Sequence, residues 1–410
     1  MLYKENKIAY FLLIFRVEYA IFLYLTFNVF KLYISMKRKI LITLLIFSTG
    51  FIMGADYSKI DKKSGSVPQN LRTVKDITHY LTKSLNSPTD KARAIYYWIA
   101  HNISYDVAKM NSNATYTDPQ QLIDEVLKTR KGVCANYSAL FQACCQSAGV
   151  QSYIIDGYTR QYGKIMSLPH AWNAVKMNGR FYDIDATWAS GYLNGNKYTR
   201  QFTDDFFMIS PDEFIKTHMP FDPVWQFSNN PVTHKEFETG DFSSLTKESN
   251  FNYSDFIKKQ SGLSIIEKLS GENQRIQKYG ITNSMIRNKV IQNQQGINTE
   301  KFNNAVNNFN AGVEMYNKYI RFKNKQFQNL TMKDEEILEL LSSTRQFFEL
   351  AEQTLSDTYP MSNDFNKSIQ SMEKSIKGMK NNLDNEDKFI SKYIKTSKPL
   401  RLLLFYKAKE

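Results

Sequence analysis

Cys134 stands where a helix is expected to begin, a position that favours a reactive thiolate. Apolar side chains follow it at helical spacing over residues 135–148, and Gly149 supplies a stop. The first turn of a helix combines free backbone N–H groups with the positive end of the helix dipole, so it stabilises a thiolate and an oxyanion. Gly132 lets the backbone turn sharply before the helix. An isolated cysteine is more often a small core residue, so the interpretation needs a second group.

The second group comes from a predicted β-hairpin. Two short runs of strand-forming residues, 170–177 and 180–188, are separated by the dipeptide Asn178-Gly179. Asn-Gly between two such runs is the strongest short-range signal for a two-residue hairpin turn.

The hairpin predicts which side chains meet. A two-residue turn pairs Met177 with Arg180, and counting back places His170 and Asp185 on the same face as diagonal neighbours. Such neighbours lie about 7–8 Å apart, within reach of a hydrogen bond between an imidazole and a carboxylate. Asp183 lies on that face one step further away and is the weaker candidate.

These residue types form the parts of a catalytic triad. An imidazole that donates one ring N–H to a carboxylate keeps its other nitrogen free to take a proton from a thiol. We therefore predict Cys134 as nucleophile, His170 as base and Asp185 as the residue that orients the base.

The remaining histidines are interpreted as structural or solvated, and the remaining cysteines as structural. His79, His101, His218 and His234 show no spacing typical of a metal site, so we predict neither a metal nor a cofactor. Cys144 and Cys145 lie roughly 15 Å along the helix from Cys134, and we expect them in the core.

The order of the elements predicts an α+β domain followed by an all-α region. Two helices are expected between residues 71 and 99, and a strand is expected over residues 150–158. The predicted limits are a linker at 56–70, the α+β domain at 71–238, a linker at 239–261 and a helical bundle or long-helix domain at 262–410. The last region contains long helical stretches near 300–329, 332–357 and 363–394, and it carries no histidine or cysteine.

Composition narrows the classes of protein. The chain has 410 residues, 42% of them apolar and 14% aromatic, which suits a folded core rather than a disordered chain. The net charge of +13 allows anionic partners, but no basic run interleaved with aromatics indicates a nucleic-acid groove. An odd total of three cysteines excludes a disulfide scaffold.

The start of the chain predicts export. Residues 36–55 show the layout of a secretory signal peptide, with a cationic stretch, a short apolar run and small residues before Asp56. We interpret residues 1–35 as a misassigned extension; the alternative is a membrane hairpin formed by residues 8–54. Mass spectrometry of the mature N-terminus distinguishes these readings, since a peptide from residues 1–35 would contradict the first.

Three segments, in the order and spacing expected, resemble transglutaminase-like domains. Residues 132–141 look like the nucleophile helix of that superfamily, residues 170–175 like its histidine strand and residues 182–188 like its aspartate strand. Position by position, the family's cysteine, histidine and aspartate fall on Cys134, His170 and Asp185. Segments 206–214 and 223–226 are similar to an extension of the kyphoscoliosis-peptidase branch.

The resemblance implies a papain-like α+β fold, with the cysteine helix packed on an antiparallel sheet. It also implies attack on an amide or ester carbonyl of a protein or peptide substrate through a thioester intermediate. Water as acceptor gives a peptidase or amidase, an amine gives cross-linking, and some family members are binding modules without activity. For the helical region we expect a partner on the cell envelope, and for the whole chain no nucleic acid.

Overall fold

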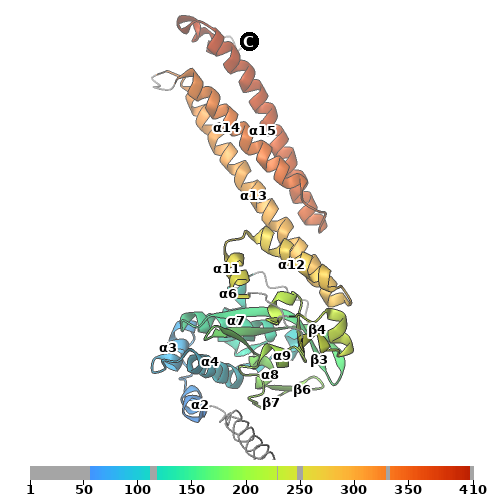
Figure 1. The fold of residues 1–410 in the computed structure, drawn as a ribbon. Helices are drawn as coiled ribbons and strands as arrows, with labels where there is room; N and C mark the ends of the chain where they lie inside the picture. Colours follow the sequence, from blue (N-terminus) through green and yellow to red (C-terminus); the bar gives the residue numbers. More distant parts are fainter. Residues whose placement is uncertain (1–55, 111–117, 229, 247–252, 329–332, 407–410) are drawn as a thin grey trace, which may run out of the picture. The chain divides into compact units, whose positions relative to one another are not determined.

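The computed structural model describes residues 56–110, 118–228, 230–246, 253–328 and 333–406 (Figure 1). The predicted signal peptide and the predicted N-terminal extension lie outside these residues. The chain divides into two units, Met1–Lys59 and Ile60–Glu410, and the second is described below. Among the described helices, none combines the length and the apolar character that a membrane span requires.

Along the chain, helices precede and follow the strands of the central sheet. Those before it are α2 (Ser58–Ser64), α3 (Val74–Thr82), α4 (Pro88–Asn102), α5 (Val107–Met110), α6 (Pro119–Thr129) and α7 (Cys134–Ser147). Those after it are α8 (Ala186–Ser190), α9 (Pro211–Phe214), η1 (Pro223–Gln226), α10 (His234–Thr239), η2 (Ser243–Thr246) and α11 (Tyr253–Ser261). The last two lie in the segment predicted as a linker, whose limits remain a prediction.

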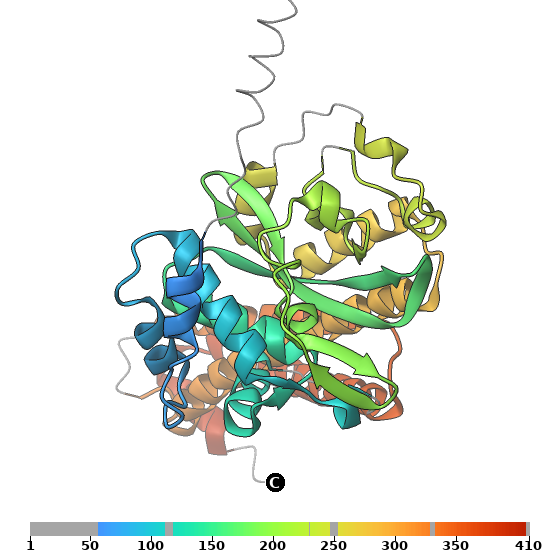
Figure 2. The ribbon, with the colours of Figure 1, turned by 90° about the horizontal axis from the view of Figure 1, so that it is seen from below.

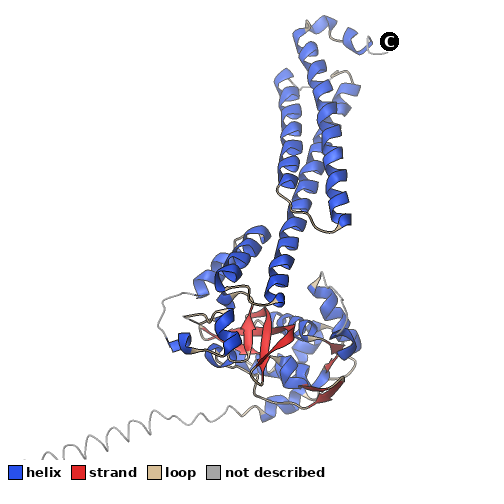
Figure 3. Ribbon diagram, turned by 90° about the vertical axis from the view of Figure 1, so that its right-hand side faces the viewer, coloured by secondary structure: helices blue, strands red, loops and turns tan. Residues whose placement is uncertain are grey.

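The central sheet is antiparallel and contains four strands in the order β5-β4-β3-β8. These strands are β3 (Ser152–Gln161), β4 (Lys164–Met177), β5 (Arg180–Ile184) and β8 (His218–Pro220). Two smaller ladders join β1 (Ser104–Tyr105) to β2 (Lys131–Gly132) and β6 (Gly191–Asn194) to β7 (Lys197–Arg200). Figure 3 shows a central group of strands among the helices and further strands at one side of the domain.

The hairpin has the predicted register but a shorter second strand. Met177 pairs with Arg180 and Asn173 with Ile184, as a two-residue turn requires. The prediction of a strand through residue 188 is wrong, because α8 starts at Ala186. The Asp185 side chain accepts hydrogen bonds from two backbone N–H groups of the first turn of α8, and this cap ends the strand.

Helix α7 packs against the sheet, which confirms the predicted α+β class with a cysteine helix on an antiparallel sheet. A buried amide joins the two layers, because Asn173 on β4 donates to Ser138 O on α7 over 3.0 Å and to Tyr153 O on β3 over 3.3 Å. Ser138 lies one helical turn after Cys134, so this bond holds β4 alongside the start of α7.

Long helices form the C-terminal region, as predicted. They are α12 (Ile265–Tyr279), α13 (Ser284–Asn324), α14 (Asp334–Ser356) and α15 (Asn363–Lys395), followed by η3 (Lys398–Leu400) and α16 (Leu403–Tyr406). Helices α13, α14 and α15 lie side by side and enclose an apolar core that includes Phe348 and Leu383 (Figures 1 and 3). Helix α13 begins earlier than the predicted residue 300, because Asn283 caps it and accepts from Ile286 N.

Helix α12 and the first turns of α13 pack on the α+β domain. Ile276 and Ile286 share a buried cluster with Tyr158 of β3 and Met219 of β8. Figure 2 shows the beginning of α13 beside the strands of the sheet.

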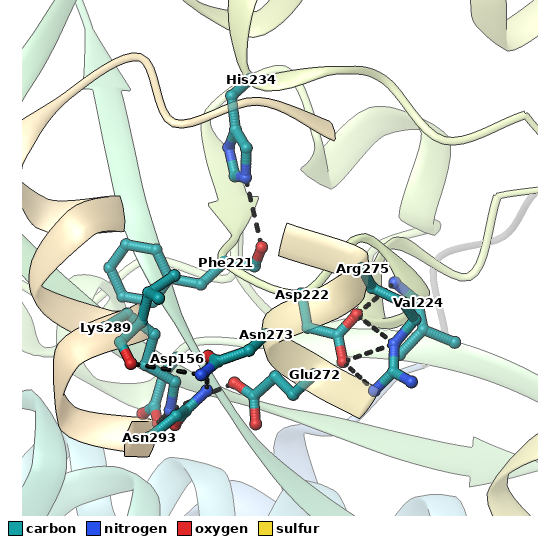
Figure 4. A network of polar contacts seen from close by, with 11 residues as sticks. Asp156, Phe221, Asp222, Val224, His234, Glu272, Asn273, Arg275, Lys289 and Asn293 are labelled. Carbon is teal, nitrogen blue, oxygen red and sulfur yellow. Dashed lines mark hydrogen bonds and ion pairs between the residues drawn. The ribbon is translucent and has the colours of Figure 1, made fainter. Parts of the chain in front are cut away.

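Ion pairs surround this cluster (Figure 4). Arg275 donates three hydrogen bonds to Asp222, and Lys289 contacts both Asp156 and Glu272. Asp222 lies two residues after the end of β8, so α12 fixes the segment that carries His218.

Candidate active site

Cys134 is the first residue of α7 and is partly exposed. Asn136 holds the start of this helix, because its Oδ1 accepts from Val133 N over 2.9 Å and its Nδ2 donates to Leu122 O over 3.0 Å. A Cβ atom on Gly132 would lie 2.5 Å from the Asn136 Cβ, so the glycine is needed for this close approach. These contacts fix the start of α7, so Cys134 lies in the first turn of a helix, where backbone N–H groups lack intrahelical acceptors.

Tyr105 is brought to the same place by the β1–β2 ladder. It pairs with Gly132, two residues before Cys134. Burial raises the pKa of Tyr105 above its usual value, and the charge of Cys134 raises it further. Its hydroxyl group therefore stays protonated and can donate a hydrogen bond beside the thiol.

His170 and Asp185 form a short hydrogen bond. Nε2 of His170 lies 2.7 Å from Oδ2 of Asp185, and both side chains are largely buried. The other carboxylate oxygen, Oδ1, accepts from the backbone N–H groups of Thr187 and Trp188 over 2.8 and 3.1 Å. These bonds leave the carboxylate a single orientation, with one oxygen on the helix and one on the imidazole.

Cys134 also acts on His170, since its side chain contributes to raising the pKa of the imidazole. Since Nε2 is held by Asp185, Nδ1 is the nitrogen left for the thiol. Burial by itself lowers the pKa of His170, but the charge and hydrogen bond of Asp185, with a contribution from Cys134, outweigh it and raise the pKa to about 10. Burial raises the pKa of Asp185, but the charges and hydrogen bonds of His170 and His218 outweigh it. The pKa of Asp185 therefore falls below its usual value. The pair therefore favours imidazolium and carboxylate at neutral pH.

His218 is the residue that the sequence analysis missed. It was interpreted as structural or solvated, but its Nε2 lies 3.3 Å from the same Asp185 oxygen that contacts His170. Burial lowers its pKa to about 4, so at neutral pH it is an uncharged hydrogen-bond donor to the carboxylate. No local signal could have found it, because it lies on β8, far along the chain from the hairpin.

Aromatic rings enclose this group. His170 lies between Trp172 and Trp188, with ring centroids 6.2 and 5.8 Å away, and His218 stacks on Phe214 at 4.0 Å. A shell of this kind keeps water from the hydrogen bonds of Asp185 and strengthens them.

Asp183, the weaker candidate, has a different environment. Its Oδ1 accepts from the indole N–H of Trp172 over 3.1 Å, and burial raises its pKa well above the usual value. It supports Trp172, and none of the hydrogen bonds in the described residues joins it to His170.

One group of side chains in the described residues has the composition and the spacing of a metal site. It consists of His170, Asp185 and His218, whose ligand atoms lie within 4.8 Å of one another. Both imidazole rings direct Nε2 to one carboxylate oxygen, and hydrogen bonding accounts for that arrangement. We therefore treat the three side chains as one hydrogen-bonded group.

A cleft of about 670 Å³ opens over His170. Its walls include Tyr105, Trp188, Tyr192 and Tyr198, and its rim carries apolar side chains that are exposed, such as Leu168. Exposed apolar groups that border a concave surface are typical of binding sites for apolar and peptide-like ligands.

The environment of the three cysteines predicts selective alkylation. Burial raises the pKa of Cys144 to about 11 and that of Cys145 well above its usual value, and both are fully buried. Iodoacetamide near pH 7 should therefore label Cys134 at least about tenfold faster than either of the others. Peptide mass spectrometry over a time course measures the three rates. Equal labelling, or preference for the buried pair, would show that Cys134 is a structural cysteine.

Comparison with known proteins agrees with this geometry. The model of the family described as "Transglutaminase-like superfamily" matches residues 75–186, a range that contains Cys134, His170 and Asp185. Kyphoscoliosis peptidase of Mus musculus is 30% identical over 229 residues, which cover 54% of this chain and 32% of that protein. The Homo sapiens protein is 30% identical over 224 residues, covering 52% and 32%, so the chain spans about a third of the length of these relatives.

More distant similarities are found as well. Hillarin of Drosophila melanogaster is 25% identical over 206 residues, which cover 45% of this chain and 24% of that protein. A solved structure described as a TGase is 19% identical with a TM-score of 0.23, covering 40% of each chain. An arylamine N-acetyltransferase from Mycobacterium abscessus is 17% identical with a TM-score of 0.22, covering 36% of this chain and 46% of that chain.

Proposed function

Because the chain belongs to the transglutaminase-like superfamily, we propose that it is an exported thiol hydrolase that cleaves amide bonds of peptides or proteins. The observation that carries the proposal is the short hydrogen bond between Asp185 and His170, an imidazole that lines a cleft and whose pKa the side chain of Cys134 helps to raise. Export rests on the sequence pattern of residues 36–55.

In the first step of acylation, His170 accepts the proton of the Cys134 thiol. The thiolate attacks the carbonyl carbon of the substrate, and a C–S bond forms while the oxygen becomes an oxyanion. The oxyanion collapses, the C–N bond breaks, and the amine leaves with the proton that His170 returns. Asp185 keeps the imidazolium oriented throughout, because its second oxygen is fixed by the first turn of α8.

Backbone N–H groups at the start of α7 and the Tyr105 hydroxyl group are proposed to stabilise the oxyanion. We assign this role to the backbone N–H groups of Cys134 and Ala135, since the start of a helix leaves its first N–H groups without intrahelical acceptors, whereas Asn136 N already donates to Val133 O. We assign the Tyr105 hydroxyl as a further donor because it lines the cleft beside Cys134 and burial keeps it protonated.

Deacylation completes the cycle when water attacks the thioester. His170 accepts a proton from this water, the C–S bond breaks, and the substrate leaves as a carboxylic acid. We favour water over an amine because the cleft is open to solvent and its described walls supply no enclosed channel for a lysine side chain.

Partition of the acyl-enzyme tests the choice of acceptor. The protein is incubated with a glutamine-containing peptide and a fluorescent primary amine, and incorporation is measured against hydrolysis. Hydrolysis should exceed incorporation, and both should vanish in Cys134→Ala. Incorporation above hydrolysis would make the protein a cross-linking enzyme. Absence of any Cys134-dependent reaction over a broad peptide panel would favour a binding module without activity.

The long helices are proposed to present the site to a partner on the cell envelope. The support for this role is the lack of histidine and cysteine in residues 262–410 together with the positive net charge of the chain.

A further inference from the structure

The cleft contains a cationic side chain whose charge no described carboxylate balances. Arg160 lines the same cavity as His170. Its Nε is buried without a hydrogen-bond partner, and none of the ion pairs in the described part of the chain includes its guanidinium group. Burying a donor of this kind without a partner is costly, so the Nε of Arg160 is a candidate to donate to a ligand in the cleft.

Arg93 and Arg275 show the contrast with Arg160. Arg130 also has buried nitrogens without a hydrogen-bond partner, but its guanidinium group lies over the Trp98 ring and donates to Leu71 O. Arg93 pairs with Asp61 and Asp204, and Arg275 pairs with Asp222. In both cases the carboxylates lie within 2.6 Å of guanidinium nitrogens. Arg160 differs from these residues because it borders the cleft rather than a packed interface.

The backbone around Arg160 holds its side chain in place. The register of β3 and β4 shifts between Tyr158 and Arg160, and the Arg160 N–H donates to Thr217 O over 2.8 Å. The guanidinium group lies against two glycines, since a Cβ on Gly240 would come within 2.7 Å of Nη2 and a Cβ on Gly163 within 4.0 Å.

Capping of helix α10 does not explain this position. The guanidinium group lies beside the C-terminal end of α10, where Lys or Arg side chains often contact the last carbonyl groups. These carbonyl groups already accept other donors, because Phe237 O receives Gly240 N, Glu236 O receives Asp241 N, and Lys235 O receives the Thr239 hydroxyl. None of the hydrogen bonds in the described residues involves a guanidinium nitrogen of Arg160 at this end.

The strand register sets the distance between this cation and the reacting groups. His170 pairs with Gly157, and Arg160 lies three residues further along β3. At about 3.3 Å per residue of strand, the offset is roughly 10 Å. An extended peptide whose scissile bond lies at His170 and Cys134 would place a group two or three residues away beside Arg160.

We propose that Arg160 forms an anion subsite of the cleft, and that the preferred substrate carries a carboxylate two or three residues from the scissile amide. The assignment of a substrate class rests on the proposed function. A carboxylate fits because guanidinium binds it through two parallel hydrogen bonds. It can be an acidic side chain or the C-terminal carboxylate of the peptide.

Binding to the full-length Cys134→Ala protein tests the subsite without turnover. Three peptides are compared by isothermal titration calorimetry: acetyl-Ala-Phe-Ala-Glu-Ala-amide, its Gln counterpart, and the Gln peptide with a free C-terminal carboxylate. At least one acidic peptide should bind about tenfold more tightly than the neutral one, as a charge-assisted hydrogen bond allows. The first acidic peptide reports a side-chain carboxylate, and the second reports a C-terminal one.

Two variants in the Cys134→Ala background make the result specific. Arg160→Gln should abolish the preference while leaving the affinity for the neutral peptide within about twofold. Arg180→Gln removes an equal charge from an exposed position on β5, and it should keep the preference. Equal affinities for the three peptides, no detectable binding of either acidic peptide, or a preference that survives Arg160→Gln would overturn the subsite.

The outcome separates the two proposals. Acidic peptides that bind through Arg160 but are never cleaved by the unmodified protein would retain the subsite and refute the hydrolase. Cys134-dependent cleavage without a preference for a carboxylate would retain the hydrolase and refute the subsite.

Discussion

Replacing Cys134 with alanine should reduce turnover by about 10³-fold or more, because it is the partly exposed cysteine beside His170, whereas Cys144 and Cys145 are buried. His170→Ala should have a similar effect, since the thiol then loses its proton acceptor and the leaving amine its proton donor. Residues that act as a unit lose activity non-additively, so the triple variant with Asp185→Asn should be little worse than Cys134→Ala alone.

Steady-state hydrolysis of a peptide, with active-site titration by a thiol probe, measures this series. Cys144→Ala is the matched control, because Cys144 lies on the same helix but is fully buried in the core. It should keep turnover within a few-fold of the unaltered protein. Full activity in Cys134→Ala would show that the reaction uses a different nucleophile, and losses that multiply across the triple variant would show independent roles.

Asp185→Asn should reduce kcat by about 10²- to 10⁴-fold while leaving the fold intact. The asparagine keeps the shape of the side chain but loses the charge that holds His170 as an imidazolium. Burial then dominates and lowers the His170 pKa from about 10. The imidazolium is the form present below its pKa, so the alkaline limb of the pH–rate profile should move to lower pH by more than about one unit.

Asp183→Asn provides the matched control, two residues before Asp185 and on β5. Burial raises the pKa of Asp183 well above its usual value, so a neutral amide resembles the state that the site favours. Its carbonyl oxygen can still accept from the Trp172 indole. We expect turnover within about fivefold and an unmoved alkaline limb. Comparable losses in both variants, or an unchanged pH profile in Asp185→Asn, would show that Asp185 does not tune the imidazole.

The register of the central hairpin was predictable because it depends on neighbours in the chain. A two-residue Asn-Gly turn permits one pairing, and the alternation of a strand then brings His170 and Asp185 to one face. The start of α7 at Cys134 was also a local feature, set by its apolar spacing and by the glycine before it. Family resemblance pointed to the same three residues.

Local sequence patterns gave wrong predictions where side-chain hydrogen bonds or packing replaced the expected backbone structure. The second strand of the hairpin was predicted too long, because the Asp185 side chain caps α8 and the capping bonds replace the ladder. The sharp turn expected at Gly132 was in fact a close approach to Asn136, which only packing of α7 against its neighbours shows.

Tertiary structure alone decided the remaining members of the site. His218 reaches Asp185 from β8, Tyr105 reaches Cys134 through a ladder with β2, and Arg160 enters the cleft beyond a register shift. Their positions depend on contacts between segments far apart in the sequence, and such contacts leave no periodic trace in the residues themselves. Periodicity and turn chemistry report what a chain does within a few residues, whereas the surroundings of a buried carboxylate depend on which distant strand packs against it.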